Sequence, residues 1–323
     1  MTRACKVWLL TALGLLILGT AICLGALAAG GFDFRRLFGA SVSDLTVNVH
    51  EVRDPFDRIS IQGESDEIVF LPSEDGTCRV TCREKETLRH TVSVENGTLT
   101  VRTLDERKWY DYIGILSDEP QIAVSLPAGA YAALSVETQT GDVEIPADFT
   151  FDRLTVRGST SDVTCRASVR ETLDLSVSTG DLTLSDLSAG ALRLSVSTGK
   201  VQAAAIACAG RIDVSSSTGK ILLTGVTCQD LSIAGRTGDA VLDGVVASVT
   251  LTAVLRTGDI LLRNCDAAAL SLRTSTGDVT GTLLTGKLFV TDCGTGHVSV
   301  PSTSSGGRCE IVTGTGDIEI SLS

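Results

Sequence analysis

The sequence predicts an all-β fold: a β-solenoid of about ten coils of 19–20 residues, with an irregular β cap and one N-terminal transmembrane helix before it. Three observations predict this architecture. A Thr-Gly pair recurs at a nearly constant interval, apolar and polar residues alternate on both sides of each pair, and an uncharged run of 23 residues lies near the N-terminus. We therefore expect a membrane anchor at 1–30, a juxtamembrane linker at 31–58, a β cap with the first coils at 59–132, and the repeat solenoid at 133–323.

The first element is the uncharged run from Val7 to Ala29. As a helix it is long enough to cross a hydrocarbon core of about 30 Å with a slight tilt. A cleaved signal peptide is the alternative, because Ala26 and Ala28 have the small-x-small spacing of a cleavage site, but such signals have shorter apolar cores. Basic residues flank the run on both sides, so their distribution does not set the orientation. The short tail before the run is typical of a protein whose N-terminus stays in the cytoplasm. We predict a single-pass protein of the cell membrane, with a cytoplasmic N-terminus and an extracytoplasmic solenoid.

The cap at 59–132 is strand-like but irregular. Asn96-Gly97 is a typical hairpin turn between alternating runs, and Ser65-Asp66 has the character of a degenerate repeat corner. End coils need special sequences, because an uncovered solenoid end leaves strand edges unpaired.

An aromatic cluster stands out within the cap. Trp109, Tyr110 and Tyr112 are one of the two Trp and two of the three Tyr of the chain. A capping or packing loop is the simpler interpretation. Exposed aromatic residues also mark ligand or membrane contacts, so this loop is a candidate partner-contact site.

The repeat is defined by its corners. Ten Thr-Gly or equivalent corners follow one another at 19 or 20 residues, with Ser161 in place of glycine at the second corner. A strand-to-strand corner commonly needs a positive φ, which glycine adopts without steric cost. The structural turn glycines are therefore predicted to be Gly141, Gly180, Gly199, Gly219, Gly238, Gly258, Gly277, Gly296 and Gly316.

One repeat of this length cannot bury its own apolar face, so neighbouring coils must stack about 4.8 Å apart. Ten coils then make a rod on the order of 45 Å long. The alternation predicts inward ladders of aliphatic side chains, with members such as Leu173, Leu175, Val177, Leu192, Leu194 and Val196.

Composition excludes several classes of function. The formal net charge of -12 and the absence of a basic stripe argue against nucleic-acid binding. His50, His90 and His297 lie far apart in sequence, so we predict no metal site, and no cofactor or catalytic residue is assigned. The cysteines are scattered singly, as small buried hydrophobic residues are. Cys208 and Cys228 are the exception, because each follows a corner glycine by nine residues and the two could be neighbours on adjacent coils.

The corner acids are predicted to be turn residues. Their positions, Asp142, Asp162, Asp181, Asp239, Asp259, Asp278 and Asp317, would line one edge of the rod, which leaves calcium binding as an alternative. Calcium takes six to eight oxygen ligands, and one acid per coil, interrupted by lysines, supplies few. Arg236 and Arg256 recur one coil apart beside such acids, which suggests Arg-to-Asp pairs between coils.

The uncharged N-terminal span, the "IAVSLPAG" stretch before the first corner and the repeated "S-x-TGD-[VIL]-x-[LI]" corners resemble the bacterial putative adhesin family. The resemblance covers roughly Ile59 to Ser323. It implies a membrane-tethered or secreted β-solenoid of the bacterial cell envelope, often encoded near envelope-stress or membrane-regulatory genes, and it provides no catalytic residues. Ser161 at a corner and basic residues after some corner glycines depart from the motif, so we do not expect the corner aspartates to form one uniform binding site.

These observations favour a non-enzymatic, adhesin-like binding or structural protein whose partners are the membrane and an envelope polymer or surface protein. An accessory role in envelope stress or membrane regulation is the alternative. A polysaccharide-degrading β-helix enzyme is a weaker one, since the near-identical coils lack long loops that could wall a cleft. The sequence leaves the oligomeric state and the identity of the partner open.

Overall fold

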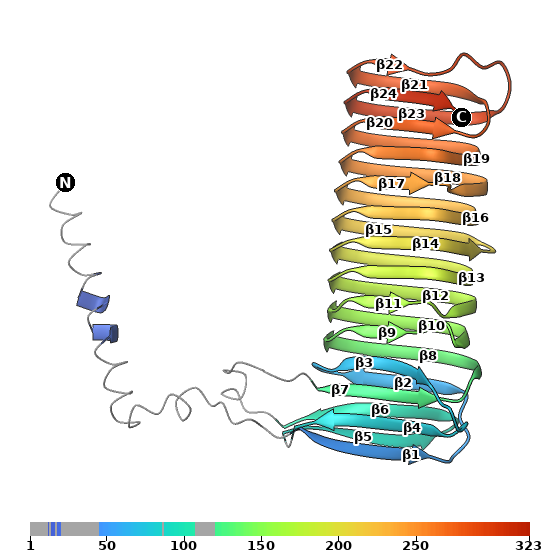
Figure 1. Cartoon of the computed structure of the whole chain (residues 1–323). Helices are drawn as coiled ribbons and strands as arrows, with labels where there is room; N and C mark the ends of the chain where they lie inside the picture. Colours follow the sequence, from blue (N-terminus) through green and yellow to red (C-terminus); the bar gives the residue numbers. More distant parts are fainter. Residues whose placement is uncertain (1–11, 13, 17, 21–44, 86, 107–119) are drawn as a thin grey trace.

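The computed structural model describes residues 12, 14–16, 18–20, 45–85, 87–106 and 120–323 of the chain. Within them the chain winds into a rod of stacked strands, shown in Figure 1. The strands are β1 (Thr46–Val52), β2 (Arg58–Gly63), β3 (Glu67–Pro72), β4 (Cys78–Glu84), β5 (Leu88–Glu95), β6 (Thr98–Asp105), β7 (Gln121–Leu126), β8 (Gly129–Thr140), β9 (Val143–Ile145), β10 (Phe149–Thr160), β11 (Val163–Cys165), β12 (Ser168–Thr179), β13 (Leu182–Thr198), β14 (Val201–Cys208), β15 (Arg211–Thr218), β16 (Ile221–Thr237), β17 (Ala240–Asp243), β18 (Val246–Thr257), β19 (Ile260–Thr276), β20 (Val279–Leu283), β21 (Lys287–Thr295), β22 (Val298–Ser299), β23 (Gly307–Thr315) and β24 (Ile318–Leu322).

Each coil contributes one strand before the Thr-Gly corner and a further stretch after it, and both pair in parallel with their counterparts in the neighbouring coils. The face before the corner runs in space through β8, β10, β12 and the later part of β13, and the face after it through β9, β11 and the first part of β13. The register advances by one repeat at each step. The predicted β-solenoid is therefore confirmed.

The core consists of ladders of identical positions. Leu154 pairs with Leu134 on one side and Leu173 on the other, and the row continues through Leu192 to Leu270. The predicted inward residues, from Leu173 to Val196, are at most 3% exposed. Stacking like on like lets each coil bury the apolar surface of the next, which is the main stabilising term of such an array.

The nine corner glycines all have φ between 128° and 146°. A Cβ added to Gly258 would lie 2.1 Å from the carbonyl oxygen of Gly238, one coil below. The corner therefore excludes a side chain for two reasons, the backbone conformation and the close approach of the next coil. Ser161 does not adopt a positive φ, so this coil turns differently.

A second corner lies a few residues after the first and was not predicted from the sequence. Five successive coils place a residue with φ between 50° and 62° there, at Asp186, Ala205, Gly225, Gly244 and Asn264. Only two of the five are glycine, so no constant residue marks this corner in the sequence.

Both ends of the rod depart from sequence order (Figure 1). At the N-terminal end, β2 lies between β6 and β8, and β3 between β7 and β9. At the C-terminal end, β23 lies between β19 and β21, and β24 between β20 and β22. The last coil of the chain is thus inserted beneath the coil that precedes it in sequence.

The N-terminal part of the chain contains one strand that the sequence did not predict, and most of the predicted membrane span lies outside the described residues. Residues 46–52, placed by the sequence in the linker, form β1, which pairs antiparallel with β4, in keeping with their alternating Thr-Val-Asn-Val pattern. Among the described residues, no helix is both long and apolar enough to cross a membrane. Most of the predicted span at 7–29 lies outside those residues, as does the aromatic cluster Trp109, Tyr110 and Tyr112.

Candidate functional site

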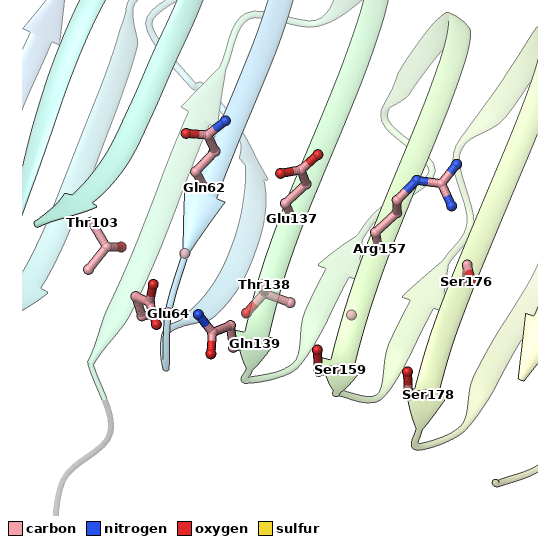
Figure 2. Close-up of a pocket in the computed structure, with 12 residues that line it drawn as sticks. Gln62, Glu64, Thr103, Glu137, Thr138, Gln139, Arg157, Ser159, Ser176 and Ser178 are labelled. Carbon is pink, nitrogen blue, oxygen red and sulfur yellow. The ribbon is translucent and has the colours of Figure 1, made fainter. Parts of the chain in front are cut away.

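A polar hollow of about 570 Å³ opens on the rod where the cap meets the first coils, across β2, β8, β10 and β12. Figure 2 shows its side chains on successive strands. One row consists of Gln62, Glu137, Arg157 and Ser176, which are in register from strand to strand. A second group toward the corners consists of Glu64, Gln139, Ser159 and Ser178, and Thr103 of β6 completes the lining.

Small residues line the hollow between these two groups. Gly63, Thr138 and Gly158 occupy the same ladder position on β2, β8 and β10, where the next coil has Val177. Alternation along each strand turns the polar residues on either side of that position outward. The result is a shallow surface with hydrogen-bonding groups repeating at the spacing of strands, about 4.8 Å.

The charges of the hollow are mixed. Glu64 and Glu137 line the hollow, and Arg157 is its cationic member (Figure 2). Arg157 also forms an ion pair of 3.2 Å with Asp174 on β12, which is in register with Thr155, two residues before Arg157. Hydroxyl, amide, carboxylate and guanidinium groups together offer both donors and acceptors to a polar ligand.

A buried ionic cluster lies directly behind this surface. The ring Nε2 of His90 lies 3.0 Å from Asp66 Oδ1, and the ring Nδ1 lies 2.9 Å from Glu84 Oε2. All three side chains are at most 7% exposed. Asp66 Oδ2 accepts hydrogen bonds from Thr103 Oγ1 at 2.9 Å and from the Glu64 backbone N–H at 3.2 Å, so two residues that line the hollow also hold the cluster.

The cluster sets unusual protonation states. Burial disfavours a charged His90, but hydrogen bonds and the negative charges of Asp66 and Glu84 outweigh this effect, so the pKa of His90 is raised. Burial raises the pKa of Glu84, because it disfavours the charged carboxylate. Hydrogen bonds from His90 and Asn48 lower that pKa by more, so the net shift is downward. Burial, with nearby Glu84 and Asp66, raises the pKa of the Cys82 thiol to about 12.

The cluster was missed because its members lie up to 24 residues apart in sequence and come from different strands. Asp66 belongs to the degenerate corner before β3, and the Gly141 corner stacks on it, so the predicted Ser65-Asp66 corner is confirmed. The available signal was the alternation in β4, which places Cys82 and Glu84 on the buried face. Of the three histidines, only His90 enters the cluster; His297 is exposed at a corner.

The corner aspartates make a regular hydrogen-bond ladder. The Oδ1 of Asp162 accepts the backbone N–H of Asp181 at 2.7 Å, and Asp181 in turn accepts that of Lys200 at 2.7 Å. This geometry agrees with the turn role. Among the described residues, the expected ion pairs of Arg236 and Arg256 with corner aspartates do not occur; Asp239 Oδ1 instead accepts the N–H of Asp259 at 3.2 Å.

The cysteines are largely buried, as predicted. Eight are described as free thiols, of which seven are buried and Cys293 is partly exposed. Cys208 and Cys228 follow the paired residues Ala207 and Thr227 on adjacent strands, which confirms them as neighbours. Burial, and then the proximity of Cys208, raises the pKa of Cys228 to about 12.

These features define a class of protein: a capped parallel β-solenoid with glycine corners and a polar hollow where the cap meets the first coils. The chain belongs to the Toastrack DUF4097 family, which matches residues 56–209 and again 209–323. The resemblance to the bacterial putative adhesin family is thereby confirmed.

The solved structures that match the chain share little sequence with it. A putative adhesin from Parabacteroides distasonis is 16% identical, with 83% of this chain and 98% of that chain covered and a TM-score of 0.49. A putative adhesin from Parabacteroides merdae is 14% identical, with coverages of 87% and 98% and a TM-score of 0.43. A putative lipid binding protein from Parabacteroides distasonis is 13% identical, with coverages of 85% and 97% and a TM-score of 0.46. No curated protein matches the chain.

Proposed function

We propose that the protein is a non-enzymatic rod, anchored in the cell membrane by residues 7–29 and exposed outside the cytoplasm, that binds a polar polymer of the cell envelope. The observation that supports this function is the hollow across β2, β8, β10 and β12, where in-register donors and acceptors lie on a rigid surface. Membership of the Toastrack DUF4097 family, with its adhesin-like members, supports a binding or structural role in general.

The hollow suits a hydroxyl- and amide-rich chain, such as a cell-wall glycan. Its rows repeat at about 4.8 Å, close to the length of one sugar unit, and its side chains supply both donors and acceptors. An open surface of this kind gives modest affinity per site, which many copies on one envelope would raise by multivalency. The hollow is not walled as hydrolase clefts are, which favours binding over catalysis.

Cosedimentation with purified peptidoglycan sacculi tests the binding site. The full chain in detergent micelles is expected to sediment with the sacculi, and Arg157→Ala combined with Glu137→Ala is expected to raise the Kd for the sacculi about tenfold, which corresponds to a loss of roughly 1.4 kcal/mol. Arg236→Ala is the matched control, an exposed arginine on a distal coil. Equal sedimentation of the double variant and the control would exclude the hollow as the site.

Protease shaving of intact cells tests the orientation. With a C-terminal tag on the full chain, tag loss from intact cells supports an extracytoplasmic rod. Tag survival until the membrane is permeabilised would reverse the orientation and favour a cytoplasmic scaffold, in which case the accessory role in membrane regulation becomes the better hypothesis. In the cosedimentation experiment, the release of new reducing ends from the sacculi would show cleavage of the glycan and would favour the enzyme alternative.

A further inference from the structure

The buried cluster behind the hollow contains three metal-ligating groups. One of them, the Cys82 thiol, takes no part in the ion pairs between His90, Asp66 and Glu84. Cys82 Sγ, a carboxylate oxygen of Glu84 and a ring nitrogen of His90 all lie within 4.8 Å of one another, and all three residues are buried. A thiol, a carboxylate and an imidazole are the three protein ligand types that zinc takes in tetrahedral sites. In such a site the ligand atoms lie roughly 3.3–3.8 Å apart, so only small side-chain movements separate this arrangement from a filled site.

Local structure explains why the three groups converge. Cys82 and Glu84 are two residues apart on β4 and point to the same buried face. His90 follows on β5, after the short turn bridged by Lys85 and Leu88, and its backbone N–H donates to Glu84 Oε2 at 2.7 Å. The chain reversal between β4 and β5 thus returns the imidazole to the two ligands that precede it.

The outer partners of a metal site are also present. Asp66 accepts from the Nε2–H of His90, and Thr103 and the Glu64 backbone hold the Asp66 carboxylate in turn. A histidine ligand almost always donates its other ring N–H to such a carboxylate, which fixes the ring and raises its basicity. This arrangement leaves Nδ1 directed at Glu84, and the Cys82 thiol belongs to the same cluster of ligand atoms.

We propose that Cys82, Glu84 and His90 bind a zinc ion through Sγ, a carboxylate oxygen and Nδ1, with Asp66 orienting the ring and Asn48 or a water in the fourth position. Asn48 already contacts the outer oxygen of Glu84. The metal joins β4 and β5 and, through Asp66, the first corner of the rod, so its role is to fasten the cap. It does not depend on the polymer binding proposed above.

A proton and the metal compete for this place. The Nδ1 of His90 lies 2.9 Å from Glu84 Oε2, so a proton held between these atoms would occupy part of the space that the metal needs. A thiol and a protonated imidazole lose protons when they bind a metal, so the affinity for zinc rises with pH. The mixed sulfur, nitrogen and oxygen ligand set selects zinc or a similar borderline metal over magnesium and calcium, which take oxygen ligands.

Cobalt titration of the full chain in detergent, after removal of metal with a chelator, tests the site. One Co²⁺ per chain is expected, with the thiolate charge-transfer band and the intense visible bands of tetrahedral cobalt, both lost on addition of zinc. Cys82→Ser should abolish the charge-transfer band, and Cys78→Ser should retain it, because Cys78 lies on the same strand and is buried but outside the cluster. Cys5→Ser and Cys23→Ser are included in every sample to remove the two remaining N-terminal thiols.

A second measurement keeps the test valid if Cys82→Ser does not fold. In the unmodified chain, stoichiometric zinc should raise the thermal midpoint by several degrees, more at pH 8 than at pH 6, and the chelator should reverse the rise. A chain that takes up no stoichiometric cobalt and shows no zinc-dependent rise overturns the proposal, as does a charge-transfer band that is equal in Cys82→Ser and Cys78→Ser.

Discussion

Lys287 and Asp266 form an ion pair of 2.6 Å although their strands, β21 and β19, are not neighbours. β23 lies between them, and its Gly307 pairs with Lys287. The Lys287 side chain is 5% exposed, and Thr285 lies within hydrogen-bond distance of both charged groups. The pair therefore holds the outermost coil across the inserted one.

This ion pair predicts a loss of stability in acid. Burial raises the pKa of Asp266, but hydrogen bonds from Lys287 and Thr285 lower it more, so the folded pKa lies below the unfolded value of 3.8. A carboxyl group whose pKa is lowered by folding stabilises the folded state at pH values above its unfolded pKa. This stabilisation is lost as the pH falls through the folded pKa. In denaturant unfolding between pH 5 and pH 2.5, the stability advantage of the unmodified chain over Asp266→Asn should shrink below about pH 4. Asp292→Asn, an exposed change on β21, is the control; a constant advantage of the unmodified chain across this range would refute the linkage.

The corner glycines predict a large cost for any β-branched residue. Gly258→Val places a Cβ 2.1 Å from the Gly238 carbonyl oxygen at a φ of 138°. Strain and overpacking together should cost about 3 kcal/mol in the free energy of unfolding. Gly129→Ala is the control, because a Cβ added at that position would meet nothing within 4 Å. A thermal midpoint unchanged by Gly258→Val would show that the corner geometry is wrong.

Ser161 and Gly158 should be energetically coupled. A Cβ on Gly158 would lie 2.9 Å from Ser161 Cβ, whereas the next coil carries Val177 at the same ladder position. Gly158→Val should therefore cost about 2 kcal/mol in the unmodified chain and clearly less in Ser161→Gly, where that side chain is gone. A double-mutant cycle on unfolding free energies measures this coupling, expected at about 1 kcal/mol. Additive effects would mean that the serine does not occupy the space that Gly158 leaves.

The second corner predicts a stabilising change. Ala205 has φ of 54°, a left-handed conformation that costs a residue with a Cβ about 1–2 kcal/mol. Ala205→Gly removes this strain but gives the unfolded chain more freedom, so the net gain should be about 0.5–1 kcal/mol. Ala204→Gly, one residue earlier and without a positive φ, should destabilise by a similar amount. The two substitutions are thus expected to shift the urea midpoint in opposite directions.

The corner aspartates are expected to act through the backbone. The Oδ1 of Asp259 accepts the N–H of Asp278 at 2.8 Å. Asp259→Ala should lose about 0.5–1 kcal/mol, whereas Asp259→Asn, which keeps an acceptor oxygen, should be nearly neutral. Millimolar calcium should leave the thermal midpoint unchanged in all three proteins. A calcium-dependent rise that is lost in the asparagine variant would restore the calcium alternative.

The coil itself was predictable from the sequence because two strong signals coincide. Each corner needs a glycine at one position, and each inward ladder needs an aliphatic residue at alternate positions. The second corner was not predictable, because Asp186, Ala205 and Asn264 all reach a left-handed φ there without a common residue type. The spatial order of the end coils was also hidden. Gly316 follows Gly296 by the same interval as any other pair, so periodicity shows that coils stack without showing which coil lies on which.

The site was less accessible than the fold for the same physical reason. The hollow brings Gly63 and Gly158 to either side of Thr138, an arrangement that requires the spatial order of β2, β8 and β10. The cluster of His90 with Asp66 and Glu84 joins three segments of the irregular cap, where the repeat provides no register. Contacts between central coils can be predicted from the sequence of one repeat. Contacts at the end of the rod can be predicted only when the spatial order of the cap strands is known.

The interleaved ends have an evolutionary consequence. A duplication or deletion of one repeat between β10 and β18 changes the length of the rod and leaves both of its termini intact, since each such coil contacts only its sequence neighbours. The same event within β2–β8 or β19–β24 would separate partners that are not consecutive, such as Asp278 and Asp317. Lineages of this protein should therefore differ in the number of central repeats while their two ends keep a fixed length.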